Sequence, residues 1–168
     1  TLRLFPTRAA PTSLPLTPRP RAVVSASAID IDGDGDDDIV CAMPTGPSDV
    51  AVPDHIRVFR SEPYGLVDET WYRVPEPRAV RAGDLDGNGR PDLIAYGPSG
   101  IWLLTNLGRG WFSQPRSLSR RPTSGVVVAD LDGDRRVDVA ALEPRRSRIR
   151  VWRGTGAGHF VSGGTVKV

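Results

Sequence analysis

The sequence has few cysteines, histidines or lysines and no long apolar run. Its 168 residues include one cysteine, Cys41, so a disulfide bond within the chain is excluded. Cys41 lies in the apolar run "DIVCAM", which predicts a buried strand thiol and not a reactive one. No apolar run approaches the roughly 18 residues that a membrane-spanning helix needs. We therefore expect no transmembrane segment, and membrane association only through a partner.

Glycine and proline are abundant instead. The 18 glycines and 16 prolines favour many turns over long helices. Hydrophobic residues make up 39% and charged residues 25% of the chain, as in an ordinary globular protein. These proportions predict a single domain over residues 1–168.

Three acidic segments recur with the same internal spacing. They read "DIDGDGDDD" over 30–38, "DLDGNGRPD" over 84–92 and "DLDGDRRVD" over 130–138, and they hold 13 of the 20 acidic residues. Their first residues, 30, 84 and 130, are 54 and 46 positions apart. Apolar, β-prone runs stand before and after each segment. This pattern predicts two strands joined by an acidic turn.

A second element repeats at the same period. It reads "IRVF" from Ile56, "IWLL" from Ile101 and "IRVW" from Ile149, with an earlier "LRLF" from Leu2. Alternating apolar residues predict a third strand in each unit. The glycine-rich turns and aromatics of "NLGRGWF" and "GTGAGHF" then indicate a fourth.

Units of about 50 residues with four strands are typical of β-propeller blades. We predict an all-β fold, a partial or small β-propeller with blades at 21–75, 76–121 and 122–168. An N-terminal half-blade is expected at 1–20. Because complete propellers commonly have four to eight blades, three units leave closure open. Either "TVKV" over 165–168 closes back on residues 1–5, or the chain is a fragment, an open array or half of an assembled ring. An uncovered edge strand favours docking on another protein.

The acidic segments place oxygen ligands at alternate positions of a tight turn, where they can converge. A hard cation such as Ca²⁺ takes six to eight oxygens and tolerates a flexible set better than Mg²⁺ does. Positions one, three, five and nine of the segments are Asp30, Asp32, Asp34 and Asp38, then Asp84, Asp86, Asn88 and Asp92, then Asp130, Asp132, Asp134 and Asp138. Position seven would add the backbone carbonyls of Asp36, Arg90 and Arg136. The sequence predicts two or three Ca²⁺ ions.

The third segment departs from the other two at position six. Gly35 and Gly89 occupy this position in the first two segments, and Arg135 occupies it in the third. If position six needs a positive φ, arginine costs roughly 1–2 kcal/mol there. We therefore expect the third segment to bind Ca²⁺ most weakly or not at all.

Other interpretations of the acidic segments fit their residues less well. Zinc is disfavoured because the segments contain no histidine or cysteine. An EF-hand needs a bidentate glutamate at position twelve, which is Cys41, Ala95 or Ala141 here. Solvated Asp-Gly turns without metal remain the simple alternative. Three repeats of one spacing favour metal binding.

These residues resemble the FG-GAP or VCBS-type repeat family, which includes the calcium-bearing blades of integrin α-subunit propellers and many bacterial secreted proteins. The family loop is Asp-x-Asp-Gly-Asp/Asn-Gly-x-x-Asp followed by a strand. The segments at 30–38 and 84–92 match it fully, and the third departs at Arg135. From about Arg21 onward, the resemblance implies a β-propeller, Ca²⁺ loops that hold its hairpins together, and a binding role.

Catalytic patterns are missing from the sequence. It contains no Gly-x-Ser-x-Gly string, P-loop or Rossmann fingerprint. His55 and His159 lie near no serine or cysteine motif, and both are predicted to be exposed structural residues. The carboxylates outside the acidic segments form no acid–base pair, so we expect no enzyme. They are Asp49, Asp54, Glu62, Asp68, Glu69, Glu76 and Glu143.

Tryptophan and arginine are the residues that bear on partners. All four tryptophans are predicted to pack in blade cores, with Trp71 and Trp111 the better candidates for an exposed contact. Strand alternation in "RIRVWR" would put Arg148, Arg150 and Trp152 on one face. A protein partner is expected through blade edges or arginine-rich faces. Nucleic acid is not expected, because no recognition motif accompanies the charge.

Taken together, these features favour a non-catalytic, calcium-stabilised protein-binding or scaffold module. Weak to moderate Ca²⁺ sites suit calcium-rich compartments, so we expect an extracytoplasmic location, periplasmic or secreted. One variant is an extrinsic subunit docked on the outer face of a membrane complex. The alternatives are a lectin-like propeller that binds carbohydrate and a fragment of a larger propeller enzyme.

Overall fold

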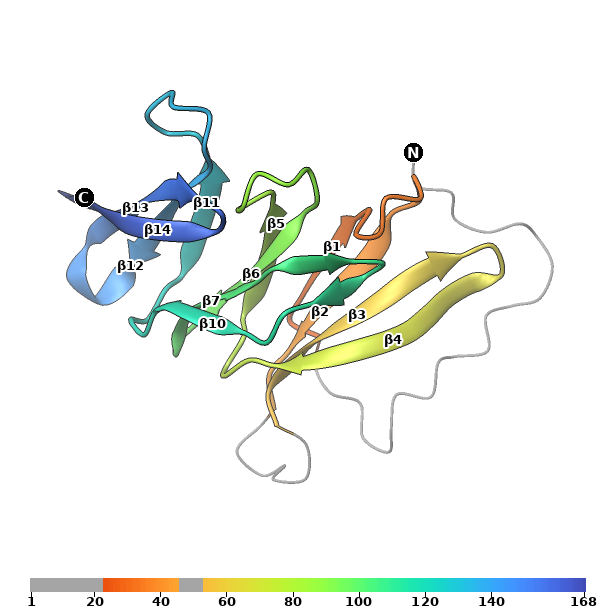
Figure 1. The fold of residues 1–168 in the computed structure, drawn as a ribbon. Helices are drawn as coiled ribbons and strands as arrows, with labels where there is room; N and C mark the ends of the chain where they lie inside the picture. The colour runs from red at the N-terminus through yellow and green to blue at the C-terminus, as the bar shows by residue number, and fades with distance from the viewer. Residues whose placement is uncertain (1–22, 46–52) are drawn as a thin grey trace.

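The computed structural model describes residues 23–45 and 53–168 (Figure 1). The half-blade expected at 1–20 lies outside the described residues. Within these two ranges, the regular structure is β throughout, apart from turns and one short 3₁₀ segment, Pro144–Arg146. The all-β prediction is therefore confirmed. In the described part of the chain, no helix is long and apolar enough to cross a membrane.

Three four-stranded antiparallel sheets follow one another along the chain. The first contains β1 (Ser25–Ile29), β2 (Asp38–Met43), β3 (His55–Glu62) and β4 (Gly65–Arg73). The second contains β5 (Ala79–Gly83), β6 (Asp92–Gly97), β7 (Gly100–Leu104) and β10 (Arg116–Ser119). The third contains β11 (Gly125–Ala129), β12 (Asp138–Glu143), β13 (Arg148–Gly156) and β14 (His159–Lys167). Each sheet lies within one of the ranges expected for a blade.

We call the third and fourth strands of each sheet its outer hairpin. The outer hairpin of the second sheet is built differently from those of the other two sheets. Here β7 and β10 belong to the four-stranded sheet. Between them in the chain, β8 (Asn106–Gly108) and β9 (Trp111–Phe112) form a separate two-stranded pair. The stretch "NLGRGWF" therefore forms this extra pair, and β10 is the fourth strand of the sheet. In the first and third sheets the third and fourth strands are instead continuous, at eight or nine residues each.

The sheets stack in chain order, and the first strands of neighbouring sheets lie side by side, β1 with β5 and β5 with β11 (Figure 1). Alternation of side chains along each strand gives every sheet two faces. One core lies between the first and second sheets, around Val40, Ile56 and Leu93. A second lies between the second and third sheets, around Ile94 and Val139. This arrangement is a partial β-propeller.

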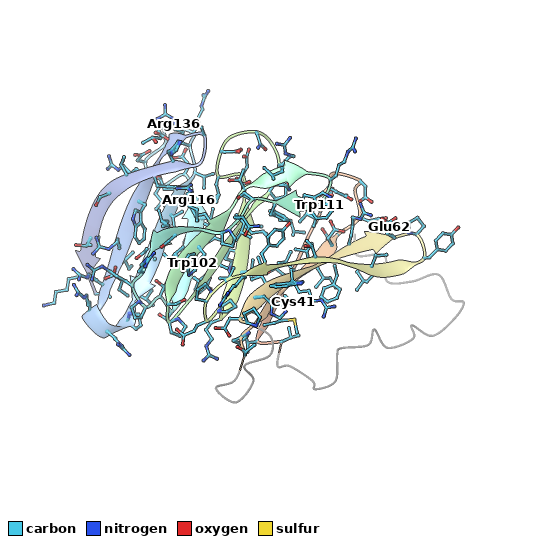
Figure 2. All side chains as sticks on the ribbon, turned by 60° about the horizontal axis from the view of Figure 1, so that its bottom comes forward. Cys41, Glu62, Trp102, Trp111, Arg116 and Arg136 are labelled. Carbon is cyan, nitrogen blue, oxygen red and sulfur yellow. The ribbon has the colours of Figure 1, made fainter. Side chains whose placement is uncertain are left out.

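Cys41, labelled in Figure 2, lies on β2 of the first sheet. It is buried in a cluster with Met43 and Phe59, as predicted. Burial raises the pKa of its thiol, which agrees with an unreactive cysteine.

Two predictions about exposure are wrong. His55 is buried, because its ring lies edge-on to Trp71 and its Nδ1 is 2.9 Å from the carbonyl of Pro53. His159 is exposed, as expected. Conversely, Trp71 and Trp111 are exposed and not in a core, since both stand on outer strands. Trp102 and Trp152 pack against the two cores as predicted.

Candidate metal centres

The first aspartate of each acidic loop organises the turn that follows it. One carboxylate oxygen of Asp30 accepts the N–H of Gly33 at 2.7 Å, and the other accepts that of Gly35 at 3.0 Å. Asp84 and Asp130 repeat both contacts in their own loops. These hydrogen bonds fold the backbone around a carboxylate that faces the loop interior.

Side chains further along each loop repeat a shorter version of this contact. The position-three aspartates accept the N–H two residues on, at 3.1–3.3 Å. The position-five residues do the same at 2.8–2.9 Å. Asp134 also has its carboxylate 3.4 Å from the guanidinium of Arg136. Each loop is thus a ladder of side-chain-to-backbone bonds, as Asp and Asn favour in turns.

The ninth residue of each loop has a different environment. Asp38, Asp92 and Asp138 are buried. One oxygen of each accepts the N–H of the second loop residue at 2.9 Å. The other accepts an N–H of the outer hairpin at 2.7–2.9 Å, donated by Ser61, Asn106 or Gly154 in turn. This aspartate therefore joins the loop to the third strand of its sheet or to that strand's extension.

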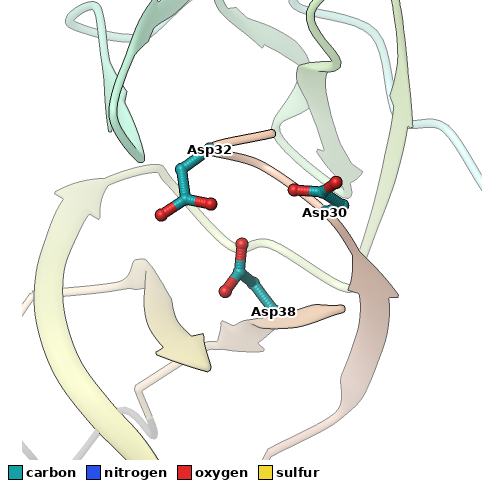
Figure 3. Close-up of side chains that lie close together, drawn as sticks. All are labelled: Asp30, Asp32 and Asp38. Carbon is teal, nitrogen blue, oxygen red and sulfur yellow. The ribbon is translucent and has the colours of Figure 1, made fainter. Parts of the chain in front are cut away.

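Three carboxylates converge in each loop. The sets are Asp30, Asp32 and Asp38; Asp84, Asp86 and Asp92; and Asp130, Asp132 and Asp138, with ligand atoms within 4.8 Å of one another. Figure 3 shows the first set turned toward a common point. Asp34 and Asp134, predicted as position-five ligands, do not join these sets. Among the predicted carboxylate ligands, those at positions one, three and nine are therefore the ones that the fold brings together in all three loops.

The residues present fit a hard cation. Each set offers only carboxylate oxygens, which suit Ca²⁺, and no nitrogen or sulfur. Burial, with a contribution from the other loop carboxylates, raises the pKa of Asp38 and of Asp92. A divalent cation would favour the ionised form of these groups and offset the repulsion within each set.

Backbone conformation at positions four and six is left-handed in all three loops. Gly35 and Gly89 have φ of 94° and 82°, and Arg135 has φ of 68°. The requirement for positive φ at position six is confirmed. Arg135 is therefore a non-glycine residue held where glycine is favoured.

The next sheet covers the first two loops but not the third. At position two, Ile31 and Leu85 are 1% and 6% exposed, whereas Leu131 is 48% exposed. Gly110, in the turn between β8 and β9, lies against Ile31, and Gly158, in the turn between β13 and β14, lies against Asp86. The third loop belongs to the last sheet of the described residues, so no such turn reaches it.

Asn106 is a buried residue of this arrangement that the sequence analysis missed. Its side-chain N–H groups donate to the carbonyl of Ile31 at 2.8 Å and that of Pro91 at 3.0 Å. Its side-chain oxygen accepts the N–H of Gly108 at 2.8 Å. Asn106 therefore ties the first loop to the second. In the sequence, the one indication of a structural role for Asn106 is its position in "TNLG", directly before a glycine-containing turn.

Arg148 and Arg150 lie on one strand face, as predicted, but their charges are engaged within the sheet. They donate to the two carboxylate oxygens of the buried Glu143, at 2.9 and 2.7 Å. Arg150 also lies over the ring of Trp152, at 5.9 Å from its centroid. Other arginines, including Arg120, Arg145 and Arg146, remain exposed.

Comparisons with known proteins agree with this geometry. A family model described as "FG-GAP-like repeat" matches residues 30–95 and 84–141. No curated protein matches the chain. Among solved structures, a lectin of Agrocybe aegerita, studied for its specific recognition of non-reducing terminal N-acetylglucosamine, aligns with a TM-score of 0.55 and 22% identity. The alignment covers 84% of this chain and 37% of the lectin, so the chain spans little more than a third of that protein.

Proposed function

The chain belongs to the FG-GAP-like repeat family, and we propose that it is a non-catalytic, calcium-stabilised binding module. The observation that carries the proposal is the convergence of three carboxylates in each of three loops. Three sites of one design, each joining the first two strands of a sheet, suit a structural role. Aspartates of each set also accept backbone N–H groups of their own loop and sheet, which suits a cation that stabilises the fold.

In this proposal the residues at positions one, three and nine hold the cation in each loop. When bound, Ca²⁺ supplies positive charge that offsets the repulsion among the carboxylates. Asp38, Asp92 and Asp138 link each loop to the outer hairpin of its sheet through their backbone contacts. A cation that orders the loop would therefore also order the outer hairpin, at the sheet edge and at the face that packs on the next sheet.

Calcium titration of the whole chain tests the metal sites. We expect two or three ions by calorimetry, and a lower melting temperature in EDTA that excess Ca²⁺ restores. Asp32→Ala should remove one ion, because Asp32 belongs to the first set. Asp37→Ala is the matched control, since this exposed neighbour lies outside that set. Unchanged melting in EDTA would contradict the proposal.

For the binding role, a protein partner is favoured, outside the cytoplasm and in one variant on the outer face of a membrane complex. The exposed arginines support an acidic partner surface. Affinity capture from native extract, with Ca²⁺ and with chelator, identifies partners that depend on ordered loops. Added salt should weaken docking through arginine. Capture that ignores both chelator and salt would count against this role.

Carbohydrate binding is the second candidate, and one observation favours it. Trp111 is exposed, and its neighbour Gly110 lies against Ile31 of the first acidic loop. An exposed aromatic beside a metal loop is suited to stacking on a sugar ring. A glycan array tests this candidate: binding should be lost in Trp111→Ala and kept in Trp71→Ala. No bound glycan would leave the protein partner as the supported role.

A further inference from the structure

An arginine contacts the position-three aspartate in two of the three acidic loops. In the first loop, Nη1 of Arg60 lies 3.6 Å from a carboxylate oxygen of Asp32. In the third loop, Nε of Arg153 lies 3.4 Å from a carboxylate oxygen of Asp132. Both aspartates belong to the carboxylate sets that would hold the cation. In these two loops, therefore, a positive side chain lies beside the proposed cation position.

The two arginines occupy the same place in their sheets. Each directly precedes the residue whose N–H bonds to the ninth aspartate of its loop, which is Ser61 in the first sheet and Gly154 in the third. The corresponding donor in the second sheet is Asn106, so Thr105 occupies the equivalent position there. Among the ion pairs within residues 23–45 and 53–168, none involves Asp86. The second loop therefore lacks the arginine that the other two share.

Several contacts hold Arg60 beside the first loop. Its Nη2 lies 2.7 Å from a carboxylate oxygen of Glu62. Its stem lies next to Gly110, because a Cβ added at that glycine would be 3.8 Å from Cδ of Arg60. The side chain of Arg60 is 27% exposed, compared with 58% for Arg153. Since solvent and salt weaken the interactions of exposed charges, Arg60 should act on its loop more strongly than Arg153 does.

A guanidinium at this distance has two opposite electrostatic effects. It attracts the loop carboxylates, and so offsets part of their mutual repulsion when no cation is bound. It also repels a divalent cation that the same carboxylates hold. The first loop has six aspartates among its nine residues, so both effects should be measurable there.

We propose that Arg60, and more weakly Arg153, are built-in counter-ions that stabilise their acidic loops without a cation and lower the affinity of those loops for Ca²⁺. This inference rests on the proposed calcium sites and names what regulates two of them. Because Thr105 is uncharged, the second loop has no such competitor. The Ca²⁺ affinity of a loop thus depends on a residue outside the loop as well as on its own nine residues.

Calorimetry and thermal melting of Arg60→Met test the proposal, since this change removes the charge and keeps most of the side-chain length. One Ca²⁺ site should bind about 10-fold more tightly, because the repulsion between the guanidinium and the divalent cation is lost. In EDTA the same variant should melt about 2–4 °C below the wild type. Arg73→Met is the control for net charge and should change neither value. Arg73 is exposed at the opposite end of the first sheet, where it pairs with His55.

The reciprocal change places an arginine beside the second loop. Thr105→Arg should weaken one Ca²⁺ site about 10-fold. Thr105→Gln is the matched control, because it lengthens the side chain without adding charge, and it should bind Ca²⁺ as the wild type does. Thr105 bonds to Ser113 through its backbone N–H and carbonyl, and both variants retain these groups.

The sign of each effect identifies a counter-ion. A residue that only packs would destabilise the chain both with and without Ca²⁺, and its loss would not tighten binding. Unchanged or weaker Ca²⁺ binding by Arg60→Met overturns the proposal, as does equal binding by Thr105→Arg and Thr105→Gln. A wild type that binds no Ca²⁺ contradicts the proposed function as well. A wild type that binds two or three ions supports the calcium sites whatever the variants show, so the two failures are distinguishable.

Discussion

The residues of each acidic loop have different structural roles. The first aspartate and the residues at positions three and five shape the turn through local hydrogen bonds. The ninth aspartate is buried and bonds to a distant part of its sheet, as Asp92 does to Asn106. Three loops share these contacts, so differences among the loops come from the few positions where the sequence varies.

Arg135 is one such position, and replacing it by glycine should stabilise the third loop. Its φ of 68° is unfavourable for an L side chain, so Arg135→Gly should raise the free energy of unfolding by about 1 kcal/mol. The same change should tighten Ca²⁺ binding at that loop. Chemical denaturation and calorimetry measure the two effects. Arg136→Gly is the control, because Arg136 is not among the residues with positive φ; an equal gain in that variant would refute the explanation.

Glu143 should make stability depend on acid pH. Burial raises its pKa, but the hydrogen bonds and charges of Arg150 and Arg148 outweigh burial and leave the pKa below the ordinary 4.5. Its ionised form is therefore favoured in the folded chain. The resulting stability is present above the unfolded pKa, near 4.5, and is lost as pH falls through the lower folded pKa.

Urea denaturation between pH 7 and pH 3 tests this dependence. Glu143→Gln should cost about 1–3 kcal/mol at neutral pH, since it weakens hydrogen bonds to charged partners. The difference from the wild type should shrink below about pH 4.5 as Glu143 becomes protonated. A constant difference over the whole range would show that the ion pairs are not its cause.

Among elements, the outer hairpin of one sheet stabilises the acidic loop of the sheet before it. The extra pair β8–β9 reaches the first loop through Gly110 and through Asn106. The turn between β13 and β14 reaches the second loop, where Arg116 also donates to the carbonyl of Gly158 at 2.5 Å. The ordering of an acidic loop therefore depends on the packing of its sheet against the next sheet.

Asn106→Ala should break this coupling at the first loop. The change leaves the carbonyl of Ile31 without its donor in a buried site, so we expect a loss of about 2–3 kcal/mol. Amides of β8, β9 and the first acidic loop should exchange faster, while those of β12 and β13 should not change. Leu107→Ala is the control, because Leu107 is exposed on the same strand. Equal effects of the two variants would exclude the role given to Asn106.

At the scale of the whole molecule, the three stacked sheets differ in how many of their faces pack against another sheet. Among the described residues, the second sheet has a core on both faces, and the third has a core on one face. In stacked repeats, stability comes largely from contacts between neighbours, so the end unit opens most easily.

Amide hydrogen exchange under native conditions should show this order. Amides of β6 and β7 should exchange only with global unfolding, and those of β12 and β13 should exchange sooner. Ca²⁺ should slow exchange in all three sheets. Slower exchange in the third sheet than in the second would show that contact between sheets does not set local stability.

Much of this architecture could be predicted from the sequence because it depends on local patterns. Alternation in "IRVF" and "IRVW" predicted strands, and spacing predicted three turns with equivalent acidic residues. The substitution of Arg135 for glycine pointed correctly to a left-handed position. By contrast, the burial of His55 and the exposure of Trp111 depend on which strand lies next to which, and residue type alone misplaced both.

The sequence by itself determined the repeat, the first three strands of each unit and the positions of the acidic residues, because these follow from side-chain alternation and turn chemistry over a few residues. Only the tertiary structure decided that three carboxylates of each loop meet in one set, to which Asp34 and Asp134 do not belong. It alone decided that Arg148 and Arg150 are engaged by Glu143, and that Leu131 is exposed where its equivalents are covered. These outcomes depend on contacts between residues far apart in the chain, which local patterns do not specify.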